Sequence, residues 1–416
     1  MSLVPRIQQP SPLQIRYVTG TLALAALFAL AAVTAAACNT DSGRPRTGPG
    51  PAPSSTPSAP ASRPTVTVTD SLGREVAVPV PANRIACLYA FTGHLVAMLG
   101  KAEQIVAVSN GLKRDVLLNT IYPSIGRTRV PKAQGALNVE ELVNARPDLV
   151  LLSGDIGRRE GERIKLERFS IPYLVIDFTT IAEQQQAIAA IGKAVGAEEP
   201  VKAYIHYYNE VLDRLAAETA DLAAEQRMRL YQATTDPTRT VPGRSLPVQW
   251  MRRIGIENLA AGLPRGGGNQ VGIEQLLLWN PEVIVANEPG VAEAMRANPQ
   301  WATLRALRDR RVLQMPIGIS RWGHPGSLET PLGALWIARA VYPERFATLD
   351  LATETRAFYR RFFHYEISDE TVSRVLKGEG MRLGKDHRPF RRLVGTGGKR
   401  RKDEGREGGG KGMRNR

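Results

Sequence analysis

The stretch at residues 272–289, GIEQLLLWNPEVIVANEP, has a counterpart earlier in the chain, at residues 138–154, which reads NVEELVNARPDLVLLSG. When the two are aligned, Glu140 matches Glu274, so the offset is 274 − 140 = 134 residues. In both copies a proline and an acidic residue precede a short apolar run, LVLL in the first and VIVA in the second. A repeat at this distance is too long for a solenoid unit and suits two sister lobes.

Each copy of this repeat predicts a helix followed by a buried strand. Asn138 with Glu141 three residues later is a helix-start pattern, and Pro147 ends the helix. The continuous apolar run after the proline is typical of a strand in a parallel sheet that is covered on both faces. Strand and helix patterns alternate elsewhere too, as in RIACLYA, GHLVAMLG and QIVAVS before the first copy and in RLYQA, PVQWMRRIG and RVLQM around the second. We therefore predict an α/β fold with two Rossmann-like lobes.

One long amphipathic helix separates the two lobes in the sequence. Apolar residues recur at helical spacing from Val201 to Leu222, which predicts a helix of about 28 residues, roughly 40 Å long. This length is sufficient to run from one domain to the next. The predicted order is an N-terminal α/β lobe at 65–196, an interlobe helix at 197–227, a C-terminal α/β lobe with closing helices at 228–378, and a basic disordered tail at 379–416.

The N-terminal region has the features of a bacterial export signal. Two arginines precede a run of 17 mostly apolar residues at 21–37, and three alanines lead to Cys38. This arrangement resembles the lipoprotein processing site, so we predict a lipoprotein signal peptide over 1–38, lipidation of Cys38 and a disordered Pro/Ser-rich tether over 39–64. The alternative is an uncleaved membrane helix, because the apolar run approaches the roughly 20 residues of a membrane span. Either interpretation places the body on the extracytoplasmic face of the cell membrane, anchored to it.

The formal charge of +15 is concentrated at the two ends of the chain. Residues 377–416 hold fourteen Lys or Arg against five Asp or Glu, a net of +9, and residues 1–64 hold five Arg and one Asp, a net of +4. The body between them keeps 15 − 9 − 4 = +2, so a nucleic-acid-binding face is not indicated. If Cys38 carries lipid, Cys87 has no disulfide partner and is expected to be a small buried hydrophobe.

Several stretches of the body together resemble the substrate-binding proteins of ABC importers, in the class III group that takes iron complexes and cobalamin. The resemblance covers roughly residues 65–378, and its motifs include the two copies of the repeat, MRRIGIENLA before the second copy and ETPLGALWIARAVYPERF after it. It implies a monomeric, periplasmic-binding-protein-like fold in which two lobes joined by a single helix hold a ligand between them. The expected ligand is an iron complex, such as a ferric siderophore or haem, or a cobalamin-like molecule, which is delivered to an importer.

Other functions are compatible with the same fold. An oxyanion-binding protein of the molybdate or tungstate type and a ligand-sensing receptor module would share the architecture. No enzyme motif occurs in the sequence: the glycine-rich PRGGGNQVG lacks the Lys-Ser/Thr of a P-loop, and there is no G-x-S-x-G, H-E-x-x-H or C-x-x-C. We therefore expect a binding protein with no enzyme activity and no cofactor of its own, although the ligand itself is expected to be a metal complex.

The resemblance also implies a function for the repeated glutamates. In this family an acidic residue on each lobe meets arginines of the importer's membrane subunits, and Glu140 and Glu274 stand at the matching positions. Each lies in the first turn of a predicted helix, where the backbone dipole favours a negative charge and the side chain is free to face outward. Helix capping alone is the alternative explanation for both.

The candidate ligand-binding residues follow predicted strands, because loops at the carboxyl ends of strands line the crevice of an open α/β sheet. Arginine and aromatic side chains suit a large, anionic and partly apolar ligand. His94 and His324 could each coordinate a metal directly. Alternatively, His94 caps its helix and His324 is only a loop residue, and the spacing of the two predicts no dedicated metal site. Many members of the family carry Ser-Pro-Ser where this chain has YAFTGH, so the identity of the ligand stays open. The candidates are Tyr89, Phe91, His94, Arg158, Arg244, Arg321, Trp322 and His324.

Overall fold

The computed structural model describes residues 63–133, 136–241, 243–264 and 269–384. The described residues belong to one compact unit. The predicted signal peptide, Cys38 and nearly all of the tether lie outside the described residues, as does the tail from residue 385. None of the helices in the described ranges combines the length and the apolar character that crossing a bilayer requires.

The N-terminal lobe contains a four-stranded parallel sheet with the strand order β4-β3-β7-β8. Its strands are β3 Ile85–Cys87, β4 Ile105–Val108, β7 Leu149–Ser153 and β8 Tyr173–Ile176. Two antiparallel pairs accompany it, β1 Thr65–Thr69 with β2 Glu75–Pro79 and β5 Lys132–Ala133 with β6 Ala136–Leu137. Its helices are α1 Ala90–Met98, the 3-10 turn η1 Ala102–Gln104, α2 Asn110–Lys113, α3 Val116–Ile121, α4 Pro123–Arg127, α5 Val139–Asn144, α6 Gly154–Gly157, α7 Glu160–Glu167 and α8 Ile181–Val195.

Helices cover both faces of this sheet, because its apolar side chains alternate between the two faces with the two-residue period of a strand. Leu149 and Leu151 of β7 belong to the core shared with α1 and α8. Val150 and Leu152 of the same strand belong to a second core, under α5, α6 and α7. Cys87 of β3 is fully buried, and burial raises the pKa of its thiol to about 12, so the prediction of a small buried hydrophobe is confirmed.

The C-terminal lobe repeats this arrangement with the strand order β10-β9-β11-β12, again all parallel. Its strands are β9 Met228–Ala233, β10 Ile256–Asn258, β11 Val283–Ala286 and β12 Val312–Gln314. A helical turn, η2 Ala224–Gln226, precedes β9. The helices of the lobe are α10 Leu246–Arg253, η3 Leu259–Gly262, α11 Ile273–Trp279, α12 Val291–Ala297, η4 Pro299–Trp301, α13 Arg305–Arg308, α14 Thr330–Val341, α15 Leu351–Phe363 and α16 Asp369–Lys377.

The two copies of the sequence repeat occupy equivalent places in the two lobes. α5 leads into β7 and α11 leads into β11, and each of these strands is third in the order of its sheet. The acidic residue after each proline binds the backbone at the neighbouring strand: Asp148 accepts from the N–H of Arg84 at 2.9 Å, and Glu282 accepts from the N–H of Arg229 at 3.1 Å. The predicted fold of two α/β lobes is therefore confirmed. The sequence repeats because each copy forms the same helix and strand in its own lobe.

The interlobe helix is shorter than the sequence predicted. α9 spans Glu198–Glu218, which is 21 residues or roughly 30 Å, and not the whole of 197–227. It ends where the hydroxyl of Thr219 donates to the carbonyls of Leu215, at 3.0 Å, and Ala216, at 3.3 Å. The chain then turns toward β9, and this turn buries Leu222 in the main core, the cluster that also contains Leu149 and Leu151 of β7. Tertiary packing therefore overrides a sequence that continues the helical pattern.

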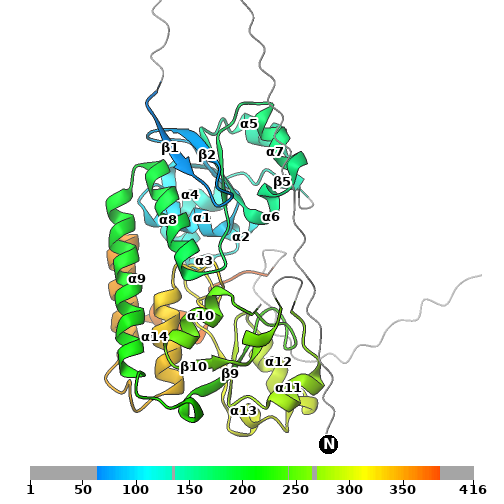
Figure 1. Ribbon diagram of the computed structural model, residues 1–416. Helices are drawn as coiled ribbons and strands as arrows, with labels where there is room; N and C mark the ends of the chain where they lie inside the picture. Colours follow the sequence, from blue (N-terminus) through cyan, green and yellow to red (C-terminus); the bar gives the residue numbers. More distant parts are fainter. Residues whose placement is uncertain (1–62, 134–135, 242, 265–268, 385–416) are drawn as a thin grey trace, which may run out of the picture. The chain divides into compact units, whose positions relative to one another are not determined.

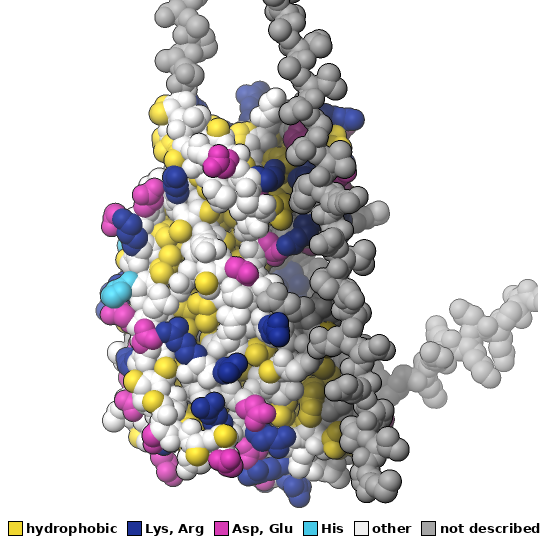
Figure 2. All heavy atoms as spheres, in the orientation of Figure 1, with side chains coloured by type: hydrophobic (Ala, Val, Ile, Leu, Met, Phe, Trp, Pro, Cys, Tyr) yellow, Lys and Arg dark blue, Asp and Glu magenta, His cyan; other side chains and the backbone are white. Residues whose placement is uncertain are grey.

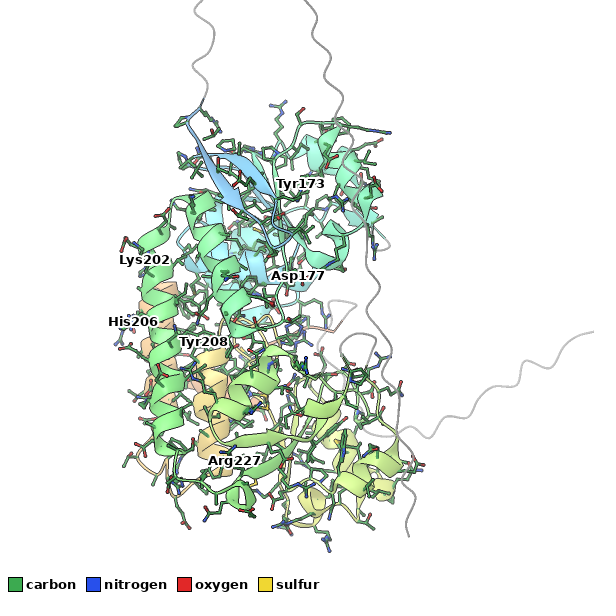
Figure 3. All side chains as sticks on the ribbon, in the orientation of Figure 1. Tyr173, Asp177, Lys202, His206, Tyr208 and Arg227 are labelled. Atoms are coloured by element: carbon green, nitrogen blue, oxygen red, sulfur yellow. The ribbon has the colours of Figure 1, made fainter. Side chains whose placement is uncertain are left out.

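Helix α9 packs against both lobes. It lies beside α8 of the N-terminal lobe and α14 of the C-terminal lobe (Figure 1). The hydroxyl of Tyr204 on α9 donates to the carbonyl of Leu328, at 2.6 Å, just before α14. Figure 3 shows Lys202 and His206 on the outer face of the helix and Tyr208 on the inner face, where it is fully buried. One core cluster, which includes β3, β7, α8, α9 and α14, therefore joins the lobes.

The chain keeps a defined conformation for several residues beyond α16. The prediction of a disordered tail from residue 379 is wrong for 379–384, because these residues return to the N-terminal lobe. The N–H of Val116 donates to the carbonyl of Met381 at 3.0 Å, and the N–H of Leu383 donates to the carbonyl of Arg114 at 2.9 Å. No local pattern in the sequence indicates this pairing, and the glycine and charge content of the tail favoured disorder.

Charged side chains of both signs are interspersed on the face of the molecule that Figure 2 shows. No large area of this face carries a single sign of charge. This distribution agrees with the small net charge of the body and differs from the basic stripe that nucleic-acid-binding proteins present.

Candidate ligand-binding site

The carboxyl ends of the two parallel sheets bring polar loops together between the lobes, as expected for an open α/β sheet. Tyr89 follows β3, Asp115 lies beyond β4, and Glu288 follows β11. The loops after β3, β4 and β12 line a small cavity with a volume of about 40 Å³, and Glu288 is joined to it through its ion pair with Arg321. The residues that line it are Tyr89, Ala90, Phe91, His94, Asp115, Ser320, Arg321, His324, Gly326 and Arg382.

Two buried carboxylates and three guanidinium groups meet at and directly behind this cavity: Asp115, Arg321 and Arg382 line it, and Glu288 and Arg114 pair with them or with each other. Asp115, which is 1% exposed, pairs with Arg382. Glu288 pairs with Arg321 and has Arg114 Nη2 at 3.5 Å and Arg382 Nε at 3.8 Å. Three positive charges therefore face two negative ones, and the partners come from both lobes. We call this set the cleft charge cluster: Arg114, Asp115, Glu288, Arg321 and Arg382.

Two histidines complete the polar lining of the cavity. His94 Nε2 lies 2.8 Å from Asp115 Oδ2, and its Nδ1 is buried with no hydrogen-bond partner among the described residues. His324 Nδ1 accepts from the N–H of Gly326 at 3.1 Å. Burial lowers the pKa of His324 well below its ordinary value, and the positive charges of Arg321 and Arg382 lower it further. His324 is therefore neutral, and the bond to its Nδ1 places its proton on Nε2 as a donor.

The described residues contain no group of three or more His, Cys, Asp or Glu placed to hold a metal ion. Guanidinium and imidazole groups dominate the lining instead, and Arg382 Nε is, like His94 Nδ1, buried without a hydrogen-bond partner in the described part of the chain. Guanidinium groups match the geometry of oxygen-rich anions through paired N–H donors. The arrangement is therefore suited to an anion.

An aromatic group forms the wall of the site on the N-terminal lobe. Tyr89 lies 5.8 Å from Phe91 and 6.4 Å from Phe178 between ring centroids, and the two phenylalanines lie 4.8 Å apart in an edge-to-face arrangement. Burial, with smaller contributions from the carboxylates of Asp177 and Asp155, raises the pKa of the Tyr89 hydroxyl. Tyr89 therefore stays protonated and can donate a hydrogen bond.

A buried carboxylate holds the loop that carries Arg321. Glu329, just before α14, accepts hydrogen bonds from the N–H of Ile319 at 3.2 Å and of Ser320 at 2.8 Å, and from the hydroxyl of Tyr359. Burial raises the pKa of Glu329, and these hydrogen bonds act in the opposite direction. A carboxylate that accepts several bonds at a buried site fixes the segment that donates them. The loop is therefore held on the core of its own lobe without any contribution from a ligand.

Of the eight candidate ligand-binding residues from the sequence, the structure brings five together at the cavity: Tyr89, Phe91, His94, Arg321 and His324. Arg158 pairs with Asp177, the residue labelled in Figure 3 just after β8, and lines a separate hollow with its side chain 59% exposed. Arg244 is exposed and does not line the cavity. Trp322 is fully buried in the main core, so its assignment to the cleft is corrected: it supports the loop from behind.

Sequence reasoning missed four of the five residues of the cleft charge cluster: Arg114, Asp115, Glu288 and Arg382. Glu288 lies two residues beyond the run VIVA, so the rule on strand ends that selected the others would have selected it too. Asp115 lies seven residues beyond the end of β4, after a short helix, and nothing local distinguishes it. Arg382 comes from the predicted disordered tail, 267 residues away in sequence from Asp115. Only the three-dimensional fold brings that pair together.

Both repeated glutamates are exposed at the second position of a helix, Glu140 on α5 and Glu274 on α11. Neither is the N-cap: Asn138 caps α5 by accepting from the N–H of Glu141 at 3.2 Å, and Gly272 precedes α11. The side-chain capping of α5 is therefore performed by another residue, which leaves the carboxylate of Glu140 free for an external contact.

Exposed apolar side chains accompany each glutamate. Phe169, which is 54% exposed, lines a shallow hollow together with Glu140, and Ile164 on the preceding α7 is 38% exposed. Leu277 and Leu278 on α11 are 40% and 79% exposed. Within the described ranges these four are the large hydrophobic residues with high exposure, two in each lobe. Such side chains on an otherwise polar surface are typical of protein–protein contacts.

Comparison with known proteins places this chain among binding proteins. A family model described as periplasmic binding protein matches residues 85–317. The molybdate-binding protein MolA of Haemophilus influenzae is 28% identical over 336 residues, which cover 74% of this chain and 93% of MolA. The structure of MolA bound to molybdate superposes with a TM-score of 0.64 at 25% identity, and covers 73% of this chain and 99% of that one.

Two further relatives have different descriptions. An uncharacterised ABC transporter substrate-binding lipoprotein of Bacillus subtilis, YvrC, is 22% identical and covers 68% of this chain and 87% of its own length. The vitamin B12-binding protein of Vibrio cholerae is 26% identical over 250 residues, which cover 59% of this chain and 84% of that protein.

Proposed function

The chain belongs to the periplasmic binding protein family and is a substrate-binding protein of the ABC transporter kind, and we propose that its cleft takes a small oxyanion of the molybdate or tungstate type. In this proposal the protein captures the anion outside the cytoplasm and delivers it to the membrane subunits of an importer. The sequence ranked an iron complex or cobalamin first and an oxyanion second; we propose the reverse order, which the geometry of the cavity supports.

The size and lining of the cavity are the observation that carries this proposal. A volume of about 40 Å³ corresponds to roughly three water molecules on this measure, which suits an ion with four oxygens. Haem, a ferric siderophore and cobalamin are many times larger. The cleft charge cluster has one more positive charge than negative, and burial strengthens the attraction of that excess for an anion. The likeness to MolA supports the same ligand class.

An iron complex or a corrinoid is the second candidate, and one observation favours it. Beside the aromatic wall, Phe178, Arg158 and Asp177 line an open hollow of about 560 Å³, which is within the usual range for sites of larger ligands. The likeness to the vitamin B12-binding protein points the same way. A large ligand would need the lobes to separate at the cleft charge cluster, however, whereas a small anion fits the cavity as it stands.

Isothermal titration of the purified protein tests the two candidates. We expect heat of binding with molybdate and tungstate, and none with cyanocobalamin, haemin or ferric citrate. Arg321→Gln should weaken molybdate binding at least tenfold, because a charge-assisted hydrogen bond contributes about 1.5–3 kcal/mol. Arg244→Gln, which changes an exposed arginine outside the cavity, is the matched control and should bind as the wild type does. Binding of cyanocobalamin or an iron complex, with no response to either oxyanion, would contradict the proposal.

The two exposed glutamates and their apolar neighbours are proposed to form the surface that docks on the importer. Each lobe presents one exposed carboxylate and two exposed hydrophobic side chains, and the two glutamates occupy repeated positions. A membrane partner built from two equivalent subunits would meet such a pair of surfaces with the same groups twice. Arginines on the partner would complement the glutamates, and the apolar side chains would be buried between them.

Lipid anchoring through Cys38 is proposed from the sequence alone, since this residue lies outside the described ranges. We expect Cys38→Ala to release the protein from the membrane fraction or to leave it unprocessed at its full length. Cell fractionation followed by mass determination distinguishes the forms, with Cys87→Ala as the control that keeps the acylation site. A Cys38→Ala protein that stays membrane-bound at full length would favour the uncleaved membrane helix.

A further inference from the structure

The segment that follows α16 crosses from the C-terminal lobe to the N-terminal lobe. We call residues 380–383 the C-terminal strap. Its backbone pairs with residues 114–116 on both sides of Asp115: the N–H of Val116 donates to Met381 at 3.0 Å, and the N–H of Leu383 donates to Arg114 at 2.9 Å. The side chain of Arg114 also donates from Nε to the carbonyl of Leu383 at 2.9 Å. The strap is therefore bound to the N-terminal lobe by three hydrogen bonds to backbone atoms.

Two glycines direct the strap along this path. Gly378, at the end of α16, and Gly380 both have positive φ angles, of 68° and 67°. A Cβ atom at Gly378 would lie 2.8 Å from the carbonyl oxygen of Met315, closer than such contacts normally are. Residues with a side chain rarely adopt this conformation, so the sequence KGEGMR is suited to a sharp reversal of the chain.

The strap carries Arg382 into the cleft charge cluster. Arg382 is 9% exposed, lines the cavity, pairs with Asp115 of the N-terminal lobe and lies 3.8 Å from Glu288 of its own lobe. Its Nε has no hydrogen-bond partner among the described residues. Asp115 retains His94, and Glu288 retains Arg321, whether or not Arg382 is present. The carboxylates are therefore satisfied without Arg382, which points to a further role for this guanidinium.

We propose that the C-terminal strap is part of the ligand site: it supplies Arg382 as a second anion-binding guanidinium beside Arg321, and its pairing with residues 114–116 fastens the two lobes around the ligand. The chemical nature of the ligand, a small oxyanion, rests on the proposed function. Two guanidiniums from different directions can share the oxygens of a tetrahedral anion, and each forms charge-assisted bonds. Because the strap is anchored on one lobe and bound to the other, its release accompanies any separation of the lobes at this point.

Truncation separates the strap from the rest of the tail. A chain that ends after Glu379 lacks the strap, and a chain that ends after Gly384 keeps it and lacks only residues outside the described ranges. In titrations with molybdate we expect the chain ending after Glu379 to bind at least tenfold more weakly than the full chain, and the chain ending after Gly384 to bind equally well. Equal affinity of both truncated chains would overturn the inference.

Point variants test the guanidinium itself while the backbone of the strap stays intact. Arg382→Gln should lose at least tenfold in molybdate affinity, and Arg382→Lys should recover part of that loss, because lysine restores the charge without the paired donors. Since both carboxylates keep other partners, neither variant should lower the midpoint of thermal unfolding of the ligand-free protein appreciably. Wild-type affinity in Arg382→Gln would remove this residue from the site.

A measurement without ligand distinguishes failure of the inference from failure of the proposed function. The amide of Val116 donates to the strap, so its hydrogen exchange should be slow in the chain ending after Gly384 and fast in the chain ending after Glu379. If the full chain binds neither molybdate nor tungstate, the proposed function fails and with it the anion-binding role of Arg382. Equally slow exchange of Val116 in both truncated chains would overturn the fastening of the lobes, whatever the ligand.

Discussion

Replacing Trp322 by alanine is expected to lower the free energy of unfolding of the ligand-free protein by about 3–5 kcal/mol, the usual cost of truncating a fully buried aromatic residue. The indole is 0% exposed and packs in the main core, next to α14. A Cβ at Gly333 of α14 would lie 3.3 Å from Trp322 Cβ, so the helix backbone lies against the loop with no space to spare. The loop therefore cannot readily collapse into the cavity that alanine would leave.

Chemical denaturation of the ligand-free variants measures this effect. Trp322→Phe should lose less than Trp322→Ala, because a ring remains in the core. Trp336→Ala on α14 is the matched control, since Trp336 is only partly buried and should cost less. We also expect Trp322→Ala to weaken anion binding indirectly, through the loop that presents Arg321. Wild-type stability combined with lost affinity would return Trp322 to the ligand site, as the sequence suggested.

Arg321 and Trp322 are neighbours in one loop, and the sequence could not predict which of them faces the cavity. The order of strands and helices places the loop after β12 at the cleft, and it does so because the carboxyl ends of parallel strands lie at one edge of a sheet. Adjacent residues of an irregular loop, however, face in directions that depend on the backbone angles of that loop. Arg321 faces the cavity and Trp322 the core. A pattern of residue types cannot separate two neighbours of this kind.

The repeat, by contrast, could be predicted because its causes are local. Asn138 does accept from the N–H of Glu141, as the spacing of the two residues indicated, and a capping box of Thr180 and Glu183 starts α8 in the same local way. Long-range pairings have no such signal. No residue near Asp115 or Arg382 in the sequence indicates that the two form an ion pair. The end of α9, likewise, depends on how Leu222 packs in the core. The fold was therefore more accessible from sequence than the charge cluster that defines the site.

Charge reversal of both repeated glutamates, Glu140→Lys with Glu274→Lys, is expected to abolish most uptake of the ligand while its affinity for the purified protein stays unchanged. Each reversal turns an attraction to the partner into like-charge repulsion, which costs several kcal/mol at a close contact. The two residues lie in different lobes and share no contact, so the single reversals should each reduce uptake and their effects should add. Uptake of labelled molybdate by cells that contain only the variant protein is the measurement.

A control pair separates docking from the electrostatics of helix ends. Glu198 and Glu370 are also exposed acidic residues in the first turn of a helix, α9 and α16, and in the described part of the chain no large exposed apolar side chain lies on either helix. Glu198→Lys with Glu370→Lys changes the net charge equally and places lysine at the same unfavourable position of the helix dipole. We expect this pair to keep uptake near the wild-type rate.

The apolar half of the proposed docking surface provides an independent outcome. Phe169→Ala with Leu278→Ala removes the most exposed large hydrophobic side chain of each lobe among the described residues and leaves every charge in place. If the surface docks as proposed, this pair should also reduce uptake, and its effect should not depend on salt, whereas ion pairs are screened over about 10 Å at 0.1 M. Normal uptake in the glutamate pair would return both residues to helix-end electrostatics, and a loss of molybdate affinity would instead mean that the surface communicates with the cleft.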